Sequence, residues 1–372
     1  MNNQRKKAIL KKITSAFYGW TFAIAGKLPK SVILSVMLPT ICELAEKNSD
    51  YFFSFNVRSK KAEDLITKED KSPHADQFAI IMQGPLVAKD DFTLETIKIY
   101  NKIYKDVLVI VSTWKNEDSK YIERIENECK CKVVLTDYPE HGGFMHTNYQ
   151  AKGTQAGLAT AKQLGKTFVF KTRSDYRFTK RGLLEFFYNI IHEYPCVKDE
   201  YGLNYRLIFT SGRNDDMYRP HFIGDQFNFG YIDDMLSFWN CQGTDYEKSS
   251  KDYYSEREKS HMTWLQDREN CSVLLKNFTK KVANRDLVID VKTYWDFVKK
   301  YLIFVSAKDC NAYWLKYDRF EETVNNGEYY PRGDSVDCLL SYNWDFALWN
   351  DLYNGTLNYD VSMENISRNN HF

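Results

Sequence analysis

The chain has 372 residues, and 43% of them are hydrophobic, which is enough apolar surface for a large buried core. Its 51 basic and 50 acidic residues leave a formal net charge of +1, so no overall field attracts nucleic acid or another polyanion. We therefore expect a globular protein without a nucleic-acid partner, built as one large α/β domain with appendages or as two smaller domains.

Eight cysteines are scattered along the chain, with one CxC at Cys129 and Cys131 and none of the paired CxxC sets that zinc sites use. This pattern indicates reduced, mostly buried thiols. Because no cleavable signal peptide is recognisable, we expect a cytoplasmic protein.

Residues 1–55 alternate basic clusters with apolar ones, and Lys27, Pro29 and Lys30 divide the apolar stretches. Neither stretch reaches the roughly 18 to 20 residues that cross a bilayer. Two interpretations are open. The segment forms amphipathic helices on the anionic surface of the inner membrane, or it packs on the protein's own core or at an oligomer interface. A lipid-linked acceptor, which a family resemblance implies below, favours the membrane interpretation. The oligomeric state is open.

Residues 56–77 are polar and predict a linker, and from Phe78 short apolar runs alternate with amphipathic segments of ten or more residues. The runs predict strands at 78–85, 107–114, 132–139 and 167–175, and the segments between them predict helices at 92–104, 119–129 and 149–165. This alternation is typical of a doubly wound, mostly parallel sheet with helices on both faces. We expect this catalytic domain to span 78–285, and a C-terminal helical and aromatic subdomain or lid to span 286–372.

Ligands of such sheets bind beyond the carboxyl ends of the strands. In FVFKTRSD, residues 168–175, a buried strand ends in Lys171, Arg173 and Asp175. A carboxylate there can hold Mg²⁺ or Mn²⁺ against the phosphates of a nucleotide, and the arginine can grip phosphate oxygens. The alternative is a structural ion-pair network.

The first strand ends in Gln83, Gly84 and Pro85, which offer a side-chain amide and a close backbone approach to a nucleotide. A simple strand-ending turn would contain the same residues. The run lacks the G-x-G-x-x-G spacing of a dinucleotide fold, and no P-loop, H-E-x-x-H or G-x-S-x-G motif occurs elsewhere, which disfavours a nicotinamide enzyme.

Several motifs in one order resemble the WavE family of lipopolysaccharide-synthesis proteins, which are GT-A-type bacterial glycosyltransferases. They are IIMQGPL, FTLETIKIY, VIVSTW, HTNYQAKGTQAGLATAKQLG and FVFKTRSDYR, all within about residues 78–177. The resemblance continues more weakly, through FIGDQFNFGYIDDM and EREKSHMTWL, to about residue 265. It implies a GT-A-like fold, a nucleotide-sugar donor, and a lipid-linked lipopolysaccharide or capsular saccharide as the acceptor.

The resemblance also implies which residues bind the donor: Gln83, Gly84, Pro85, Ser112, Thr113, Trp114, Asn148, Gln150, Lys171, Arg173 and Asp175. Asp175 stands where the family replaces the DxD of many GT-A enzymes, so it is the expected metal ligand. Arg173 occupies the place of the second acid, which leaves dependence on Mg²⁺ or Mn²⁺ open. Asn148 and Gln150 either read sugar hydroxyls or cap a helix, and Trp114 is either a stacking platform or a wedge against the core.

An inverting transfer needs a general base for the acceptor hydroxyl, and a carboxylate is the usual supplier. Asp225 and Glu258 are the candidates, and Glu256 replaces Glu258 if the weaker part of the resemblance is shifted. Asp233 and Asp234 are expected to be first-turn acids of a helix. Two histidines either donate hydrogen bonds that orient the site or are structural, and four further residues are candidates for an acceptor cleft; they are His221 and His261, and Tyr329, Tyr330, Arg332 and Trp344.

The resulting hypothesis is a cytoplasmic glycosyltransferase, peripheral to the inner membrane. Two other classes remain open. A nucleotidyltransferase or phosphosugar transferase could use a similar sheet, and a non-catalytic assembly protein could bind polysaccharide intermediates.

Overall fold

The computed structural model describes residues 29–48, 52, 57–68, 71–142, 146–211, 217–221, 223–240, 270–288, 290–315 and 343–370. The chain divides into two compact units, Met1–Ser59 and Lys60–Phe372. No helix among the described residues is long and apolar enough to cross a membrane. The domain boundaries drawn from the sequence stay predictions.

The described part of the first unit is a helical stretch made of α2 (Lys30–Val32), a π-helical turn η1 (Ile33–Met37) and α3 (Leu38–Lys47). Pro39 lies in the first turn of α3 and has no N–H for the helical bond four residues back, at the place where the backbone widens into the π turn. None of the residues in η1 or α3 is buried within the structure. Four large apolar side chains on this stretch are 40–55% exposed, namely Leu34, Val36, Ile41 and Leu44.

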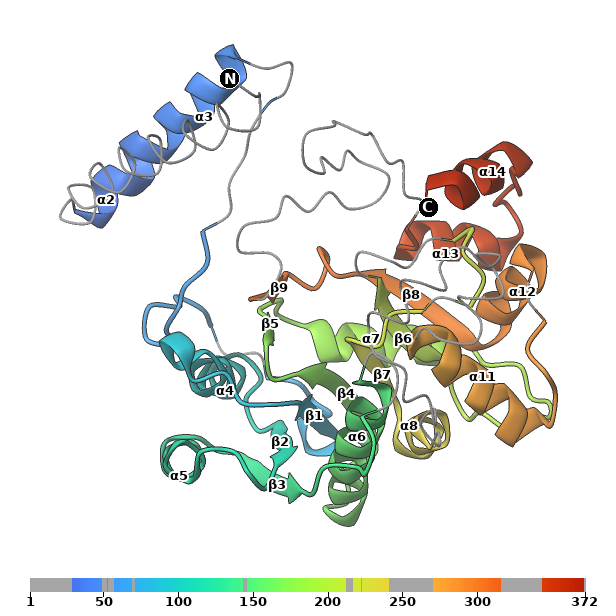
Figure 1. The fold of residues 1–372 in the computed structure, drawn as a ribbon, viewed down its shortest axis with the longest axis horizontal. Helices are drawn as coiled ribbons and strands as arrows, with labels where there is room; N and C mark the ends of the chain where they lie inside the picture. Colours follow the sequence, from blue (N-terminus) through green and yellow to red (C-terminus); the bar gives the residue numbers. More distant parts are fainter. Residues whose placement is uncertain are drawn as a thin grey trace, which may run out of the picture. The chain divides into compact units, whose positions relative to one another are not determined.

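A seven-stranded sheet forms the centre of the second unit, in the order β3-β2-β1-β4-β7-β6-β8 (Figure 1). Its strands are β1 (Phe78–Gln83), β2 (Leu108–Trp114), β3 (Lys132–Thr136), β4 (Phe168–Arg173), β6 (Leu207–Ser211), β7 (Asn228–Tyr231) and β8 (Leu302–Ser306). Within the sheet β7 runs antiparallel to β4 and β6, and the other neighbouring pairs are parallel. A separate antiparallel pair joins β5 (Tyr176–Phe178) to β9 (Ala312–Trp314).

Helices cover both faces of the sheet, which is why the central strands are buried along nearly their whole length. All of β1 is buried. On one face, α7 (Leu183–Glu193) packs its Tyr188 against Phe78 of β1. On the other, α6 (Thr147–Gln163) contacts β1 and lies beside α8 (Ile232–Trp239) (Figure 1).

Glycines let α6 approach the sheet closely. A Cβ at Gly157 would lie 2.5 Å from Cγ2 of Ile81, and a Cβ at Gly153 would lie 2.9 Å from Cγ of Gln83. The Ser112 hydroxyl of β2 donates a 2.6 Å hydrogen bond to the carbonyl of Gly153. The N-terminal half of α6 is therefore fixed against the carboxyl ends of β1 and β2.

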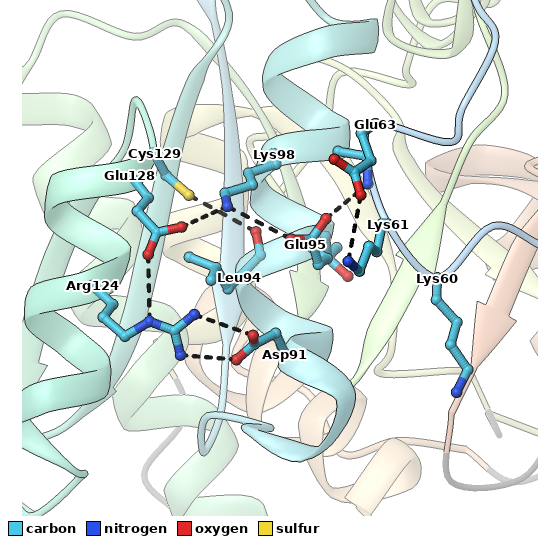
Figure 2. Close-up of polar contacts among 12 residues, drawn as sticks. Lys60, Lys61, Glu63, Asp91, Leu94, Glu95, Lys98, Arg124, Glu128 and Cys129 are labelled. Carbon is cyan, nitrogen blue, oxygen red and sulfur yellow. Dashed lines mark hydrogen bonds and ion pairs between the residues drawn. The ribbon is translucent and has the colours of Figure 1, made fainter.

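Ion pairs join α4 (Phe92–Ile103), together with its N-cap residue Asp91, to α5 (Ser119–Glu128). Arg124 binds both carboxylate oxygens of Asp91 at 3.1 Å, and Glu128 binds Lys98 at 2.6 Å (Figure 2). These groups are 29–47% exposed, so each pair contributes little stability by itself. They fix the relative position of the two helices.

The segment that leads into β1 is bound to the same surface. Glu95 of α4 accepts a hydrogen bond from the backbone N–H of Ala62, and the ammonium of Lys102 donates to the carbonyls of Ala62 and Leu65. Residues 60–65, which lie in the stretch predicted as a linker, therefore rest on α4.

The C-terminal residues complete the sheet as well as covering it. After α11 (Asn270–Ala283), α12 (Val291–Tyr301) leads directly into β8, a strand of the central sheet. Trp344 stacks on Phe304 of β8 with ring centroids 5.7 Å apart, and its indole N–H donates to the hydroxyl of Tyr294. Because Trp344 is fully buried, it is a core residue. Two further helices follow, α13 (Phe346–Asn354) and α14 (Val361–Asn370).

The fold class predicted from the sequence is confirmed: the domain is α/β, with a mostly parallel sheet between helices. The strands predicted from residue 78 to residue 175 and the helices between them all occur. Strands β6, β7 and β8, which extend the sheet from four strands to seven, were not predicted.

The close approach of α6 gives a stability prediction. Gly157→Ala should lower the free energy of unfolding by about 1–2 kcal/mol, because overpacking against Ile81 outweighs the helix preference of alanine. Urea denaturation followed by circular dichroism measures the change. Ala159→Ser alters an exposed position of the same helix and should match the wild type. Equal stability of all three proteins would contradict the packing described.

Candidate functional site

The carboxyl ends of β1, β2 and β4 meet at one edge of the sheet. In the strand register, Gln83 at the end of β1 lies between Ser112 of β2 and Arg173 of β4. Gly84 follows with φ +122°, a backbone conformation that favours glycine, and a Cβ there would lie 3.0 Å from the Ser174 hydroxyl. The predicted donor residues on these three strands are therefore neighbours.

Ser174 ties the two central strand ends together. Its N–H donates to the carbonyl of Gln83 at 3.0 Å, and its hydroxyl donates to the carbonyl of Pro85 at 2.5 Å. Its own carbonyl accepts from the hydroxyl of Thr93, which also accepts from the N–H of Val87. Every hydrogen-bonding group of Ser174 is thus used to shape the Gly84 loop.

Amide and hydroxyl groups from α6 face this edge. Gln83 is 3% exposed and its side chain packs against Gly153. The buried Oε1 of Gln150 and the buried hydroxyl of Thr154 have no hydrogen-bond partner in the described part of the chain. A buried polar atom without a partner costs about 1–3 kcal/mol, so these positions favour a polar ligand or water.

Asp175 is held by two side chains. Arg173 donates two hydrogen bonds to its carboxylate, Nε to Oδ1 at 2.8 Å and Nη2 to Oδ2 at 3.0 Å. The indole N–H of Trp314, in β9, donates to Oδ2 at 3.0 Å, and the same ring lies 5.3 Å from the guanidinium of Arg173. The Arg173–Asp175 part of the ion-pair network considered as an alternative is therefore present, and it lies at the predicted donor edge.

The pair is stable in its charged form. Burial raises the pKa of Asp175, but the hydrogen bonds and the charge of Arg173 outweigh it and hold that pKa below the ordinary value of 3.8. Burial lowers the pKa of Arg173, but Asp175, with a further contribution from the charge of Asp225, raises it above its usual range.

Lys171 and Asp225 lie next to this pair. Lys171 is fully buried in β4, where its ammonium donates to the backbone carbonyl of Asp225 and lies 4.6 Å from the centre of the Trp239 ring. Asp225 is 5% exposed and precedes β7, whose Asn228 is the register partner of Lys171. The structure thus brings Asp225 to the strand end that the sequence assigned to the donor.

Trp114, at the end of β2, is 2% exposed and packs inside the protein. It stacks on Tyr138 beyond β3, with centroids 4.5 Å apart and the rings 19° from parallel. The wedge interpretation of Trp114 therefore describes its packing, and Tyr138 is the exposed member of the pair, at 43%.

No group of three His, Cys, Asp or Glu side chains in the described ranges is arranged to hold a metal ion. Asp175 nevertheless fits one mode of binding. Mg²⁺ is usually held by one or two carboxylates together with substrate phosphates and waters, and Oδ1 of Asp175 accepts a hydrogen bond from one donor, Arg173. The metal role of Asp175 stays a prediction.

A family model described as WavE lipopolysaccharide synthesis matches residues 78–309, from the first residue of β1 to just beyond β8. The chain belongs to the WavE family. No curated protein matches it in sequence. The match extends past Leu265, where the resemblance seen in the sequence ended, and so includes the whole sheet.

Three solved structures are distant likenesses at 11% identity. Mouse xyloside xylosyltransferase 1 aligns over 64% of this chain and 96% of its own, with a TM-score of 0.32. A cytidylyltransferase from Leptospira borgpetersenii serovar Hardjo-bovis aligns over 60% and 94%, with a TM-score of 0.28. HddC from Yersinia pseudotuberculosis aligns over 46% and 80%, with a TM-score of 0.25.

Other residues singled out in this WavE sequence fall elsewhere. Glu258 lies outside the described residues, as do Glu256, His261, Tyr329, Tyr330 and Arg332. Asn148 donates to the carbonyl of His141, which shapes the loop before α6. His221 lines a cleft of about 410 Å³ beside the loop between α11 and α12, and no predicted donor residue lines that cleft.

Four residues at this edge were not predicted from the sequence: Thr93, Tyr138, Ser174 and Trp314. Tyr138 and Ser174 lie at the carboxyl ends of the strands predicted at 132–139 and 167–175, so their place at the strand ends was a usable signal. Trp314 lies 139 residues after Asp175, and nothing local indicates that the two meet.

The Arg173–Asp175 pair gives a pH prediction. Because the pKa of Asp175 is lowered on folding, its stabilising effect is present above about pH 3.8 and is lost as the pH falls through the lowered pKa. Asp175→Asn should cost about 2 kcal/mol at pH 7, the scale of a hydrogen bond to a charged group. The difference from the wild type should shrink below pH 3.8.

Urea denaturation from pH 7 to pH 3, followed by tryptophan fluorescence, measures this difference. Asp286→Asn, at a carboxylate that is 92% exposed, should follow the wild type throughout. A difference between Asp175→Asn and the wild type that is constant with pH would refute the linkage.

Proposed function

We propose that this WavE protein is a glycosyltransferase that moves a sugar from a nucleotide-activated donor to a lipid-linked lipopolysaccharide or capsular saccharide. The observation that carries the proposal is the meeting of Gln83, Gly84, Ser112, Arg173 and Asp175 at one edge of the sheet. The family's description, lipopolysaccharide synthesis, supports the class of acceptor.

Each part of the edge suits one part of such a donor. Gly84, at φ +122°, has no side chain to keep a phosphate from its backbone. The Gln83 amide, and the carbonyl of Gln150 that has no partner among the described residues, suit hydroxyl groups. Arg173 lies at the end of β4 and offers positive charge to the leaving phosphate.

In an inverting transfer, the acceptor hydroxyl oxygen attacks the anomeric carbon. The bond from that carbon to the phosphate oxygen breaks, and its electron pair leaves with the nucleotide. The hydroxyl proton passes to a carboxylate. Among the described residues the candidate is Asp225, which lies just before β7 and whose backbone carbonyl accepts a hydrogen bond from Lys171 of β4. Glu258 is the second candidate from the sequence.

Charge balance at this edge supports a divalent cation. Lys171 and Arg173 carry two positive charges, and Asp175 and Asp225 carry two negative ones, so these four groups leave a donor diphosphate uncompensated. Mg²⁺ or Mn²⁺ held by Asp175 and the donor phosphates would neutralise the charge that develops on the leaving group.

A donor screen followed by one substitution tests the proposal. The donor is chosen as the nucleotide-sugar that raises the melting temperature most, with and without Mn²⁺. Asp225→Asn should lower kcat by roughly 100-fold or more, the scale of a lost general base, and leave the affinity for the donor nearly unchanged. Asp233→Asn changes an exposed acid paired with Lys162 and should keep full activity.

The products distinguish the other classes. A glycosyltransferase releases the nucleotide and forms a glycosidic bond, whereas a nucleotidyltransferase releases pyrophosphate. For a non-catalytic assembly protein, a double variant with Asp225→Asn and Glu258→Gln would restore surface polysaccharide in a knockout as well as the wild type does, and that result would sink the enzyme proposal.

We also propose that the N-terminal helical stretch contacts the anionic inner-membrane surface, as a lipid-linked acceptor requires. The exposed Leu34, Val36, Ile41 and Leu44 supply apolar surface, and Lys30 and Lys47 flank them.

Co-sedimentation with vesicles tests this contact. Full-length protein should bind vesicles that contain phosphatidylglycerol, bind much less in high salt, and lose binding in a chain that begins at Lys60. If the shortened chain binds equally well, the contact lies elsewhere.

A further inference from the structure

An exposed aromatic ring lies at the end of the site furthest from Asp175. Tyr138 follows β3, the edge strand, and one of its faces stacks on the buried Trp114. The side chain as a whole is 43% exposed, so part of its surface is open to solvent. A flat aromatic surface of this kind suits a planar ligand.

The ring is held firmly. Tyr149 of α6 packs edge-on against both Trp114 and Tyr138, at 5.6 Å and 5.2 Å. Gly142 lies so close to Tyr149 that a Cβ there would be 3.1 Å from its ring, and Lys152 donates to the backbone carbonyl of Tyr138. Two separate segments, β2 and α6, thus fix Tyr138, so stacking of a ligand on it would cost the protein little side-chain freedom.

Three charged side chains near Tyr138 have protein partners. Lys115 and Asp137 pair at 2.6 Å, and the Lys152 ammonium donates to the backbone carbonyl of Tyr138. The open ring itself is an uncharged aromatic face, which suits a nucleobase better than it suits a phosphate.

The order of the strands gives the donor a direction. From the end of β3 to the end of β4 there are three strand spacings, or about 14 Å at ~4.8 Å each. Arg173 and Asp175 occupy the β4 end, and Asp225 lies one strand further, at β7. A nucleotide-sugar laid along this edge places its base at β3, its phosphates near β1 and β4, and its sugar toward β7.

We infer that Tyr138 is the nucleobase platform of this site and that its open face stacks on the base of the donor. The inference rests on the proposed function and adds to it the subsite that binds the base. Trp114 acts as the support beneath Tyr138 and does not touch the ligand.

Isothermal titration calorimetry of the full-length protein tests the inference with two kinds of probe. UDP, GDP, ADP and CDP carry a base, and pyrophosphate carries none. The variants are Tyr138→Ala, Tyr138→Leu, which still covers Trp114, and Tyr138→Phe, which keeps the ring. Their melting temperatures are measured first, to compare only folded proteins.

Tyr138→Ala and Tyr138→Leu should weaken binding of the preferred nucleoside diphosphate by roughly tenfold, and Tyr138→Phe by less than about twofold. Pyrophosphate should bind all four proteins equally. Equal nucleotide affinity in all four proteins overturns the inference, and so does an equal loss for pyrophosphate. A change confined to the KM of the saccharide acceptor also overturns it, since the ring would then belong to the acceptor.

The stacking inference and the proposed function can be refuted separately. If the wild type binds a nucleotide and Tyr138→Ala binds it equally well, the stacking inference fails alone. If the wild type binds none of the nucleotides, the proposed function fails with it.

Discussion

The hydrogen bonds between the ends of β1 and β4 are the constraint on which the rest of the site depends. Ser174 donates its N–H to Gln83 and its hydroxyl to Pro85, and the chain between them turns at Gly84, where no side chain fits without displacing Ser174. Here β1 and β4 run in register and then diverge, since the chain continues from β1 toward β2 on the opposite side of β1 from β4. Sheets of this kind bind ligands where neighbouring strands lead away from each other in this way. The hydrogen bonds of Ser174 therefore lie both at the ends of two buried strands and at the point where these strands separate.

Helix α6 places buried polar side chains beside this edge. Its closeness to the sheet depends on Gly153 and Gly157, and it is reinforced by the hydrogen bond from Ser112 to the Gly153 carbonyl. One consequence is that polar groups of α6 are buried beside the strand ends, where those of Gln150 and Thr154 are left without partners in the described chain. Such groups destabilise a fold unless something binds them, and they are common where a protein binds a polar ligand. The close packing of α6 is thus the reason that the site contains buried polar groups.

The sequence was sufficient for the first half of the sheet because the evidence there is local. Each strand from β1 to β4 is a short apolar run closed by polar residues, and each helix between them has a periodic apolar face, so pattern and structure agree. For β6, β7 and β8 the evidence is not local, because β7 pairs with β4 and β8 pairs with β6 across long stretches of sequence, as between Ser211 and Ser306, which are 95 residues apart. The site divides in the same way. Gln83 and Arg173 could be placed by their strands, whereas the bond from Trp314 to Asp175 depends on how β9 returns to β5.

Arg173 shows why a motif alone does not determine the electrostatics of a site. In the sequence it stands where a second acid would be expected, and this suggests that positive charge replaces a metal ion. In the structure its charge is already matched by Asp175, through two hydrogen bonds that hold the pKa of that carboxyl below its ordinary value. Lys171, whose ammonium donates to the backbone carbonyl of Asp225, lies at the same strand end, so the formal charges of these two basic and two acidic side chains sum to zero. A phosphate ligand must therefore either bring a cation with it or draw Arg173 away from Asp175, which would leave that carboxylate to Trp314 and to an incoming ion. Under either alternative, ligand binding and the Arg173–Asp175 pair are coupled.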